Sequence, residues 1–322
     1  MSTPIVGLHH VTAIASDPQR NLDFYTEVLG LRFVKRTINF DDPGTYHFYF
    51  GNDLGAPGTI LTFFPWPNAG KGRIGAGEVM ATAFSIPVGS FDFWAERLKS
   101  KGVSFTKDLR FKSRVITLSD PDGMVLELIE HEEKQAPNAP RYSGIEASRA
   151  IQGFYGVTLL ERSLEHTAQV LELIGLVKIG EEGDLIRFAP EGEALGRFVD
   201  VKVNSAAPLG SMGAGSVHHI AFRNADDAAQ AEWRRTLSQY LSVTPVQDRT
   251  YFHSIYFREP GGVLFEMATD NPGFLIDEPI ETLGEALRIP AWYEPKRKAI
   301  EARLTPLKLR HASQPSLVGA SQ

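Results

Sequence analysis

Four segments of the chain repeat the same order of strand-like and helix-like stretches. Each starts with a strand, continues with a helix and ends in further strands. The four starting strands are LHHVTAIA, MATAFSI, GFYGVTLLE and SVHHIAFR. The ends of the repeats also align, because SDPDGMVLELIE superimposes on REPGGVLFEMAT with Glu127 on Glu266. A repeat of this kind constrains the whole fold. The chain is therefore predicted to be an α+β protein of four β-α-β-β-β modules.

A segment rich in Pro, Asn and Gln, KQAPNAPRYS, separates the first two modules from the last two. It predicts an N-terminal domain over residues 1–133, a linker over 134–149 and a C-terminal domain over 150–275. The C-terminal extension, residues 276–322, contains a short helical stretch and then becomes polar and without pattern. The end of the chain is expected to be disordered.

Composition excludes several classes of protein. The 322 residues carry a net charge of −6 and no cysteine, which argues against a nucleic-acid binder and against disulfides or thiolate chemistry. No apolar run is long enough to span a membrane, and the N-terminus has no signal-peptide pattern. A cytoplasmic enzyme or binding protein is expected.

Two histidine doublets are the strongest functional signal. Four of the nine histidines stand in GLHHVT and SVHHIAF, at the start of modules one and four. Neighbouring side chains of a strand point to opposite faces, so one histidine of each doublet is expected to face a shared interior. Two imidazoles and the carboxylate of Glu266 suit Fe, Mn, Zn or Ni, and this set is typical of non-heme Fe(II) oxygenases.

The other two modules provide an internal comparison. Gly156 aligns with His10 and Ala81 with His219, whereas Glu127 still aligns with Glu266. If the fold itself required the histidines, all modules would keep them. The pattern predicts one assembled site and one vacant equivalent.

Taken together, these motifs resemble the vicinal oxygen chelate superfamily, which contains glyoxalases, bleomycin resistance proteins and extradiol dioxygenases. The stretches GLHHVT, GLRFVKRT, YHFYFGNDLGAPGTILTFFP, SVHHIAF and YFREPGGVLFEMATD are similar to its hydroquinone-type ring-cleaving dioxygenases. The resemblance extends over about residues 6–300. It implies modules paired into two cup-shaped mixed sheets with helices outside, and an enzyme that opens a para-diol ring with O2.

The ligand set follows from this resemblance. The apolar neighbours of His9 and His218 only weakly favour placing them on the other strand face, but in the family the second histidine of each doublet binds iron. His10, His219 and Glu266 are therefore the expected ligands of Fe(II), with Mn(II) as the alternative. The expected partners are a small aromatic diol and O2. The oligomeric state, including a homo-oligomer, is left open.

The resemblance also places five residues around the metal and the substrate. His9, His218 and Tyr256 are expected to serve in catalysis, and Thr12 and Arg249 to contact substrate or ligands. For Tyr256 the sequence leaves two alternatives. A hairpin loop of odd length puts it on the face of Glu266, and a four-residue loop puts Ile255 there instead. Glu127 is expected to be structural or solvent-facing rather than a metal ligand, and the sequence assigns no role to His253.

Three alternative functions come from the same superfamily. A glyoxalase-type isomerase or lyase needs four protein ligands, but Thr62 stands where the second carboxylate would be. Metal-dependent thiol transfer to an antibiotic is performed by chains of two modules rather than four. A metal-free binding protein would not need His10, His219 and Glu266 together. Three ligands leave room for a diol and O2, so the dioxygenase is favoured.

Overall fold

The computed structural model describes residues 5–132 and 144–309. Most of the predicted linker and the expected disordered end lie outside these residues. The four modules follow the predicted order. Module one contains β1 (Leu8–Ala15), α1 (Pro18–Asp23), the π-helical turn η1 (Phe24–Val28), β2 (Arg32–Ile38), β3 (Tyr46–Gly51) and β4 (Ile60–Pro65). Module two contains β5 (Glu78–Ile86), α2 (Phe91–Ser100), β6 (Phe105–Arg110), β7 (Ser113–Ser119) and β8 (Val125–Glu130).

The second half of the chain repeats this order. Module three contains β9 (Gly153–Glu161), α3 (Glu165–Leu173), β10 (Val177–Glu182), β11 (Leu185–Ala189) and β12 (Phe198–Val203). Module four contains β13 (Val217–Asn224), α4 (Asp227–Leu237), β14 (Gln247–Asp248), β15 (Phe252–Arg258) and β16 (Leu264–Pro272). The extension adds the 3-10 turns η2 (Phe274–Ile276), η3 (Ile280–Thr282) and η4 (Glu294–Lys296) and the short helix α5 (Arg297–Glu301).

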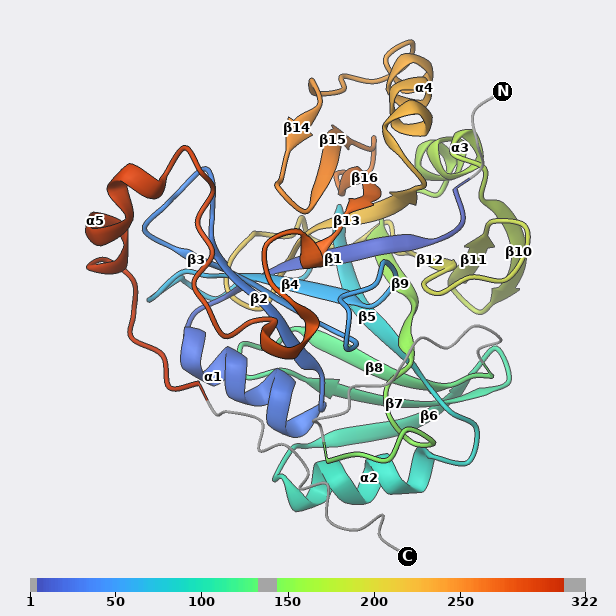
Figure 1. Cartoon of the computed structure of the whole chain (residues 1–322). Helices are drawn as coiled ribbons and strands as arrows, with labels where there is room; N and C mark the ends of the chain where they lie inside the picture. Colours follow the sequence, from blue (N-terminus) through green and yellow to red (C-terminus); the bar gives the residue numbers. More distant parts are fainter. Residues whose placement is uncertain (1–4, 133–143, 310–322) are drawn as a thin grey trace, which may run out of the picture.

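The strands form two curled, mixed, eight-stranded sheets (Figure 1). Sheet one has the order β14-β15-β16-β13-β1-β4-β3-β2, and sheet two has the order β10-β11-β12-β9-β5-β8-β7-β6. This confirms the predicted fold of paired modules. Sheet one joins modules one and four, and sheet two joins modules two and three. Each sheet therefore takes one module from each side of the predicted domain division, and the division itself stays a prediction.

The first strands of paired modules lie side by side at the centre of each sheet. In sheet one, β1 pairs with β13 in antiparallel orientation, while β4 runs parallel to β1 and β16 parallel to β13. The two histidine doublets are in β1 and β13, and Glu266 is in β16. This arrangement brings residues more than 200 positions apart onto one patch of sheet.

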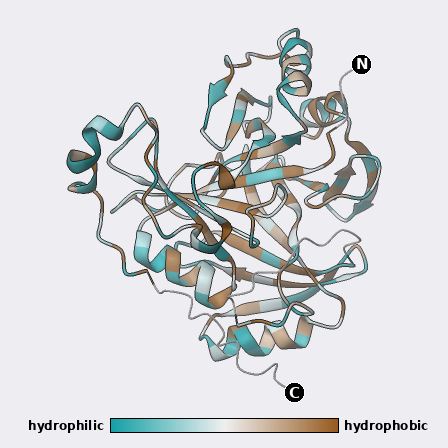
Figure 2. Cartoon of the chain, viewed as in Figure 1, coloured by the Kyte–Doolittle hydropathy of each residue, from teal (hydrophilic) through white to brown (hydrophobic). Residues whose placement is uncertain are grey.

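The helices lie at the periphery of the sheets (Figure 1), and α2 and α4 carry both hydrophobic and hydrophilic residues (Figure 2). In α2 the buried residues Phe91, Trp94 and Leu98 follow helical spacing. In α4 the buried Gln230 side chain donates hydrogen bonds to the backbone oxygens of His253 (2.7 Å) and Met267 (2.8 Å), which ties the helix to β15 and β16. Within the described ranges, no helix is long and apolar enough to cross a membrane.

The C-terminal extension connects distant parts of sheet one through a buried lysine. Lys35 in β2 is fully buried, and its ammonium group donates to Asp277 at 2.7 Å and to Glu278 at 2.6 Å. The hydroxyl of Tyr251, just before β15, donates to Asp277 at 3.0 Å. The extension thus contacts strands near both edges of the curled sheet and helps to hold its curvature.

A buried pair of glutamates between the sheets is expected to make the free energy of unfolding depend on pH. Burial, followed by the nearby Glu259 carboxylate, raises the pKa of Glu161 to about 8. Because the folded-state pKa lies above the unfolded value, stability is expected to fall as pH rises from about 4.5 to about 8. Glu161→Gln should therefore raise the free energy of unfolding at pH 8 by on the order of 1 kcal/mol or more and leave it unchanged near pH 4. Urea unfolding at both pH values measures this, and an equal gain at both would contradict it.

Candidate metal centre

His10, His219 and Glu266 come together on the inner face of sheet one. His10 comes from β1, His219 from β13 and Glu266 from β16, and all three are buried. The Oε2 atom of Glu266 lies 3.2 Å from Nε2 of His10 and 2.9 Å from Nε2 of His219. Among the described residues, this is the one group of three or more His, Asp or Glu side chains whose ligand atoms converge closely enough to hold a metal ion.

Two further observations indicate that the side chains of His10, His219 and Glu266 suit a metal ion. Among the described residues, the fully buried Oε2 of Glu266 has no hydrogen-bond partner of good geometry, whereas Ser254 donates to Oε1 of the same carboxylate. Burial alone would raise the pKa of Glu266, but the two imidazoles outweigh it and hold the pKa well below its usual value. Ligand atoms about 3 Å apart match adjacent positions around an ion with bonds of roughly 2.1 Å. A divalent cation would satisfy this charged, buried oxygen.

Each doublet sits at a β-bulge, which sequence alternation does not anticipate. Along β1, Leu8 pairs with Phe222 and His10 with Ala221, so His9 is an extra residue without a partner in β13. Along β13, Thr12 pairs with His219 and Ala13 with Val217, so His218 is the extra residue there. A bulge re-aims a side chain. The expectation that only one histidine of each doublet serves the shared face is therefore incomplete.

The extra histidines contact His10 and His219 directly. The Nδ1 atoms of His9 and His10 lie 2.9 Å apart, and those of His218 and His219 lie 2.7 Å apart. Burial, followed by the neighbouring His219, lowers the pKa of His218 to about 3. Burial also holds the pKa of His9 well below its usual value. Both extra histidines are therefore neutral at pH 7 in the metal-free protein.

Tyr256, which the sequence left undecided, faces the triad. The hairpin loop has five residues, 259–263, and Tyr256 pairs directly with Glu266. Its ring lies 5.7 Å from the ring of His219. The guanidinium of Arg249 donates to the Tyr256 hydroxyl at 3.1 Å. Thr12 lies opposite His219 in the sheet, so it too belongs to this face. His253, by contrast, points to Asp227 at 2.6 Å and away from the triad.

Sequence reasoning missed His47 and Tyr49, which belong to a second group of residues at this face. His47 and Tyr49 lie on β3, and Nε2 of His47 is 2.9 Å from the hydroxyl of Thr62. Phe252 packs its ring 4.9 Å from that of His10. The stretch YHFYF, in which a histidine and a tyrosine alternate on one strand face, was the available signal.

Sheet two carries the corresponding positions without a metal triad. Register places Glu127 opposite Ala83 and Asp200 opposite Thr158, as Glu266 lies opposite Ala221 and Thr62 opposite Thr12. The two acidic side chains form bidentate pairs with arginine, Arg110 with Glu127 and Arg187 with Asp200. Guanidinium groups thus neutralise the carboxylates where no histidine is present, and Glu127 has a structural role.

Breaking one of these pairs is expected to destabilise the fold. Arg187 and Asp200 are both about 95% buried, so Arg187→Met would leave a buried carboxylate without a counter-charge. The expected cost is about 3–5 kcal/mol. The double variant Arg187→Met/Asp200→Leu should recover most of it, because neither charge then remains. Urea unfolding measures both, and a single variant that loses less than about 1 kcal/mol would contradict a structural role.

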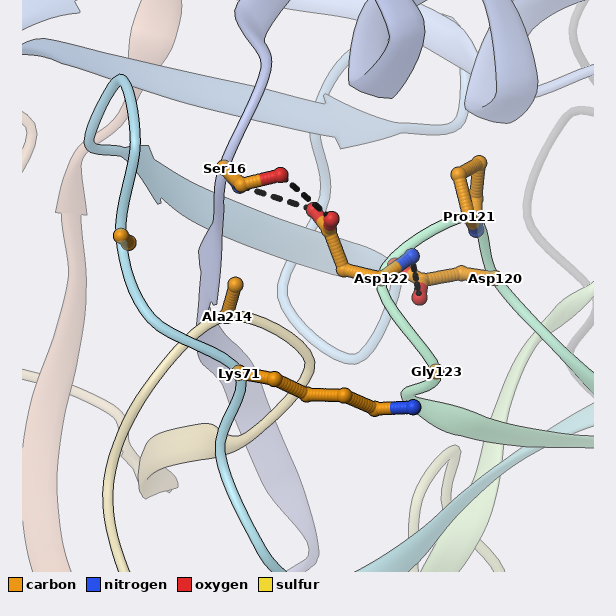
Figure 3. A pocket seen from close by; sticks show the side chains of 8 residues that line it. Ser16, Lys71, Asp120, Pro121, Asp122, Gly123 and Ala214 are labelled. Atoms are coloured by element: carbon orange, nitrogen blue, oxygen red, sulfur yellow. Dashed lines mark hydrogen bonds between the residues drawn. The ribbon is translucent and has the colours of Figure 1, made fainter.

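Two hollows of the described surface lie apart from the triad, because none of its residues lines either of them. One, of about 300 Å³, is shown in Figure 3 and is lined by Ser16, Lys71, Asp120 and Asp122 among others. Ser16 donates to Asp122 from both its backbone nitrogen and its hydroxyl, at 2.8 and 2.6 Å. The backbone of Met124 donates to Asp120 at 2.9 Å. These carboxylates stabilise a turn. The second hollow, of about 560 Å³, is lined largely by β6, β7 and the turn after β7.

Comparisons with known proteins agree with this geometry. Residues 7–128 match the family model Glyoxalase/Bleomycin resistance protein/Dioxygenase superfamily. A protein of Bacillus subtilis (strain 168), named "Putative ring-cleaving dioxygenase MhqO", is 48% identical over 312 residues, which cover 96% of this chain and 99% of that one. The "Chlorohydroquinone/hydroquinone 1,2-dioxygenase" of Sphingobium indicum is 34% identical over 300 residues, which cover 88% and 91%.

Solved structures give the same result. A crystal structure titled as a "putative dioxygenase" from Bacillus subtilis superimposes with a TM-score of 0.92 at 48% identity, covering 96% of this chain and 99% of that one. Glyoxalase I from Zea mays, at 15% identity and a TM-score of 0.63, covers 87% and 97% and shares the fold. With relatives this similar over nearly the whole chain, the protein belongs to the glyoxalase/bleomycin resistance protein/dioxygenase superfamily.

Proposed function

We propose that the protein is an Fe(II)-dependent dioxygenase that opens a hydroquinone-type ring next to a hydroxylated carbon. The observation that carries this proposal is the asymmetry of sheet one. Glu266 and Thr62 occupy equivalent positions, so the described residues gather three candidate ligand side chains, His10, His219 and Glu266, rather than four. Three ligands leave positions open for an aromatic hydroxyl and for O2. The name of the Sphingobium relative supports a para-diol as the substrate class.

The histidine doublets supply orientation in this proposal. If Nε2 of His10 and of His219 bind the metal, each Nδ1 must carry the proton and donate to Nδ1 of its neighbour. His9 and His218 then fix the tautomer and ring orientation of the ligands. This leaves Nε2–H of His218 as a hydrogen-bond donor to substrate or oxygen.

Bound Fe(II) would acidify the coordinated hydroxyl and pass electrons to O2. Tyr256 can donate a proton beside it. Burial, followed by the Glu266 carboxylate, raises the pKa of Tyr256, so the phenol keeps its proton at pH 7. Because Arg249 donates to the Tyr256 oxygen, the Tyr256 hydrogen is free to point elsewhere. Tyr256 is thus the proposed acid of the reaction, and neutral His218 is the proposed hydrogen-bond donor to substrate or oxygen. Both oxygen atoms of O2 would enter the ring-opened semialdehyde acid.

Anaerobic reconstitution tests the proposal. The metal-free protein is loaded with Fe(II) or Mn(II), and O2 uptake is followed with hydroquinone and with catechol. One O2 consumed for each hydroquinone opened by the Fe(II) form is expected. No uptake with any diol despite bound iron would reject the dioxygenase. Isomerisation of a glutathione hemithioacetal by the Ni(II) or Zn(II) form would support the glyoxalase-type alternative instead.

A further inference from the structure

The position equivalent to Glu266 in module one is filled by a hydrogen-bonded chain of four side chains. The Tyr49 hydroxyl lies 2.9 Å from Nδ1 of His47, and Nε2 of His47 lies 2.9 Å from the Thr62 hydroxyl. The Thr62 hydroxyl donates to the Thr12 hydroxyl at 2.9 Å. Tyr49, Thr62 and Thr12 are each no more than 1% exposed.

The register of sheet one places Thr12, the end of these hydrogen bonds, next to both His10 and His219. Thr12 is two residues from His10 on β1, and it lies directly opposite His219 on β13 and opposite Thr62 on β4. Paired residues of neighbouring strands share a face, as do residues two positions apart on one strand. The Thr12 hydroxyl therefore stands beside the metal centre.

The chain has a preferred polarity. Tyr49 is surrounded by the rings of Tyr251, Phe252 and Phe274, and Nδ1 of His47 is the one partner of its hydroxyl among the described residues. A buried O–H without an acceptor is costly, so Tyr49 donates to Nδ1 of His47. Burial holds the pKa of His47 well below its usual value. A neutral ring that accepts at Nδ1 carries its hydrogen on Nε2 and donates it to Thr62.

Thr62 then donates to Thr12, and Thr12 keeps its own hydrogen. Among the described residues of the protein, no acceptor for the Thr12 hydrogen is found. The one hydrogen bond of the Thr12 hydroxyl there is the bond that it accepts from Thr62. The reverse polarity would instead strand the Tyr49 hydrogen among aromatic rings. In the direction from Tyr49 to Thr12, the hydroxyl hydrogen left without an acceptor is that of Thr12, beside the metal centre.

We propose that Tyr49, His47 and Thr62 are positioning residues that hold the Thr12 hydroxyl as a donor to the oxygen of a metal-bound aromatic diol. This inference rests on the proposed function in one respect, the identity of the acceptor as an aromatic diol. The direction of the four hydrogen-bonded side chains is argued from their contacts alone and does not depend on the proposed function. Module four thus places a carboxylate, Glu266, at this position of sheet one. Module one places Thr62 at the equivalent position, and Thr62 orients a hydrogen-bond donor.

The polarity is tested without substrate or metal. In ¹⁵N-histidine-labelled, metal-free protein, two-bond ¹H–¹⁵N spectra report the tautomer of each ring, and the His47 signal is assigned from its absence in His47→Asn. The Nε2–H tautomer is expected for His47. The Nδ1–H tautomer would mean that the chain runs from Thr12 to Tyr49, and it would overturn the proposal.

The link to substrate is tested by a double-mutant cycle on the Fe(II) protein. Without O2, Thr62→Val should weaken hydroquinone binding about tenfold, as loss of one oriented hydrogen bond does. Iron content should not change, and Thr62→Ser should bind within about twofold of the parent. In a Thr12→Val background, Thr62→Val should have no further effect, because its effect passes through Thr12.

Thr158→Val is the matched control, because Thr158 is buried at the position of sheet two that corresponds to Thr12. It should leave hydroquinone binding unchanged. Parental binding by Thr62→Val, or an equal loss in both Thr12 backgrounds, would overturn the positioning role. If the parent protein holds iron and binds no diol, the proposed function fails while the tautomer still decides the polarity of the chain.

Discussion

Glu266→Gln is expected to remove the metal from the protein and to abolish ring cleavage. The amide keeps the volume of the side chain but replaces the anionic oxygen that lies about 3 Å from both imidazoles. A neutral amide is a much weaker ligand for a divalent cation in a buried site. Fe(II) content after reconstitution should fall from about one ion per chain to below about a tenth. O2 uptake should fall at least about a thousandfold, since several kcal/mol of transition-state stabilisation depend on the metal.

His10→Ala and His219→Ala should behave in the same way, and His253→Ala supplies the control. His253 belongs to sheet one as well, but its ring pairs with Asp227 and not with the triad. Its removal should leave both iron content and O2 uptake close to those of the parent. Full iron occupancy in Glu266→Gln, His10→Ala or His219→Ala would refute the assignment of that residue as a ligand.

Much of this architecture could be predicted because it depends on a repeat. Equivalent strand ends and the alternation of apolar residues are local properties, and they predicted four modules and a common position for Glu127 and Glu266. The exchange of histidine for Ala81 and Gly156 indicated which modules would share the site. The structure agrees, because sheet one joins modules one and four and gathers His10, His219 and Glu266.

What the sequence did not reveal depends on register and on contacts between distant strands. A bulge adds one residue to one strand, and no local pattern marked His9 or His218 as that residue. The same holds for the orientation of Tyr256, which a five-residue loop decides. The arginine pairs of sheet two also join side chains on separate strands, so the structural role of Glu127 rests on the Arg110 guanidinium, which reaches its carboxylate from β6.

A fourth protein ligand can be introduced by giving module one the two side chains that module four has at the equivalent positions. Register equates Thr62 with Glu266, and His47 lies beside Thr62 as Ser254 lies beside Glu266. The variant His47→Ser/Thr62→Glu should therefore present a fourth ligand on the same face. Sheet two shows that the fold accepts a carboxylate there, because Asp200 occupies the corresponding position.

This variant is expected to bind Fe(II) at least as tightly as the parent and to lose O2 uptake with hydroquinone by about a hundredfold or more. The reason is that a fourth protein ligand takes a position that the diol or O2 needs, and blocking it costs at least about 3 kcal/mol in the transition state. His47→Ser alone, which frees the space without adding a ligand, should keep its iron and lose far less activity. Iron content, thermal unfolding and O2 uptake are measured on both variants. A folded, iron-loaded double variant that opens the ring at the parental rate would mean that the open positions at this centre do not depend on Thr62. In that case, the absence of a fourth ligand could not be what separates ring cleavage from isomerase chemistry in this fold.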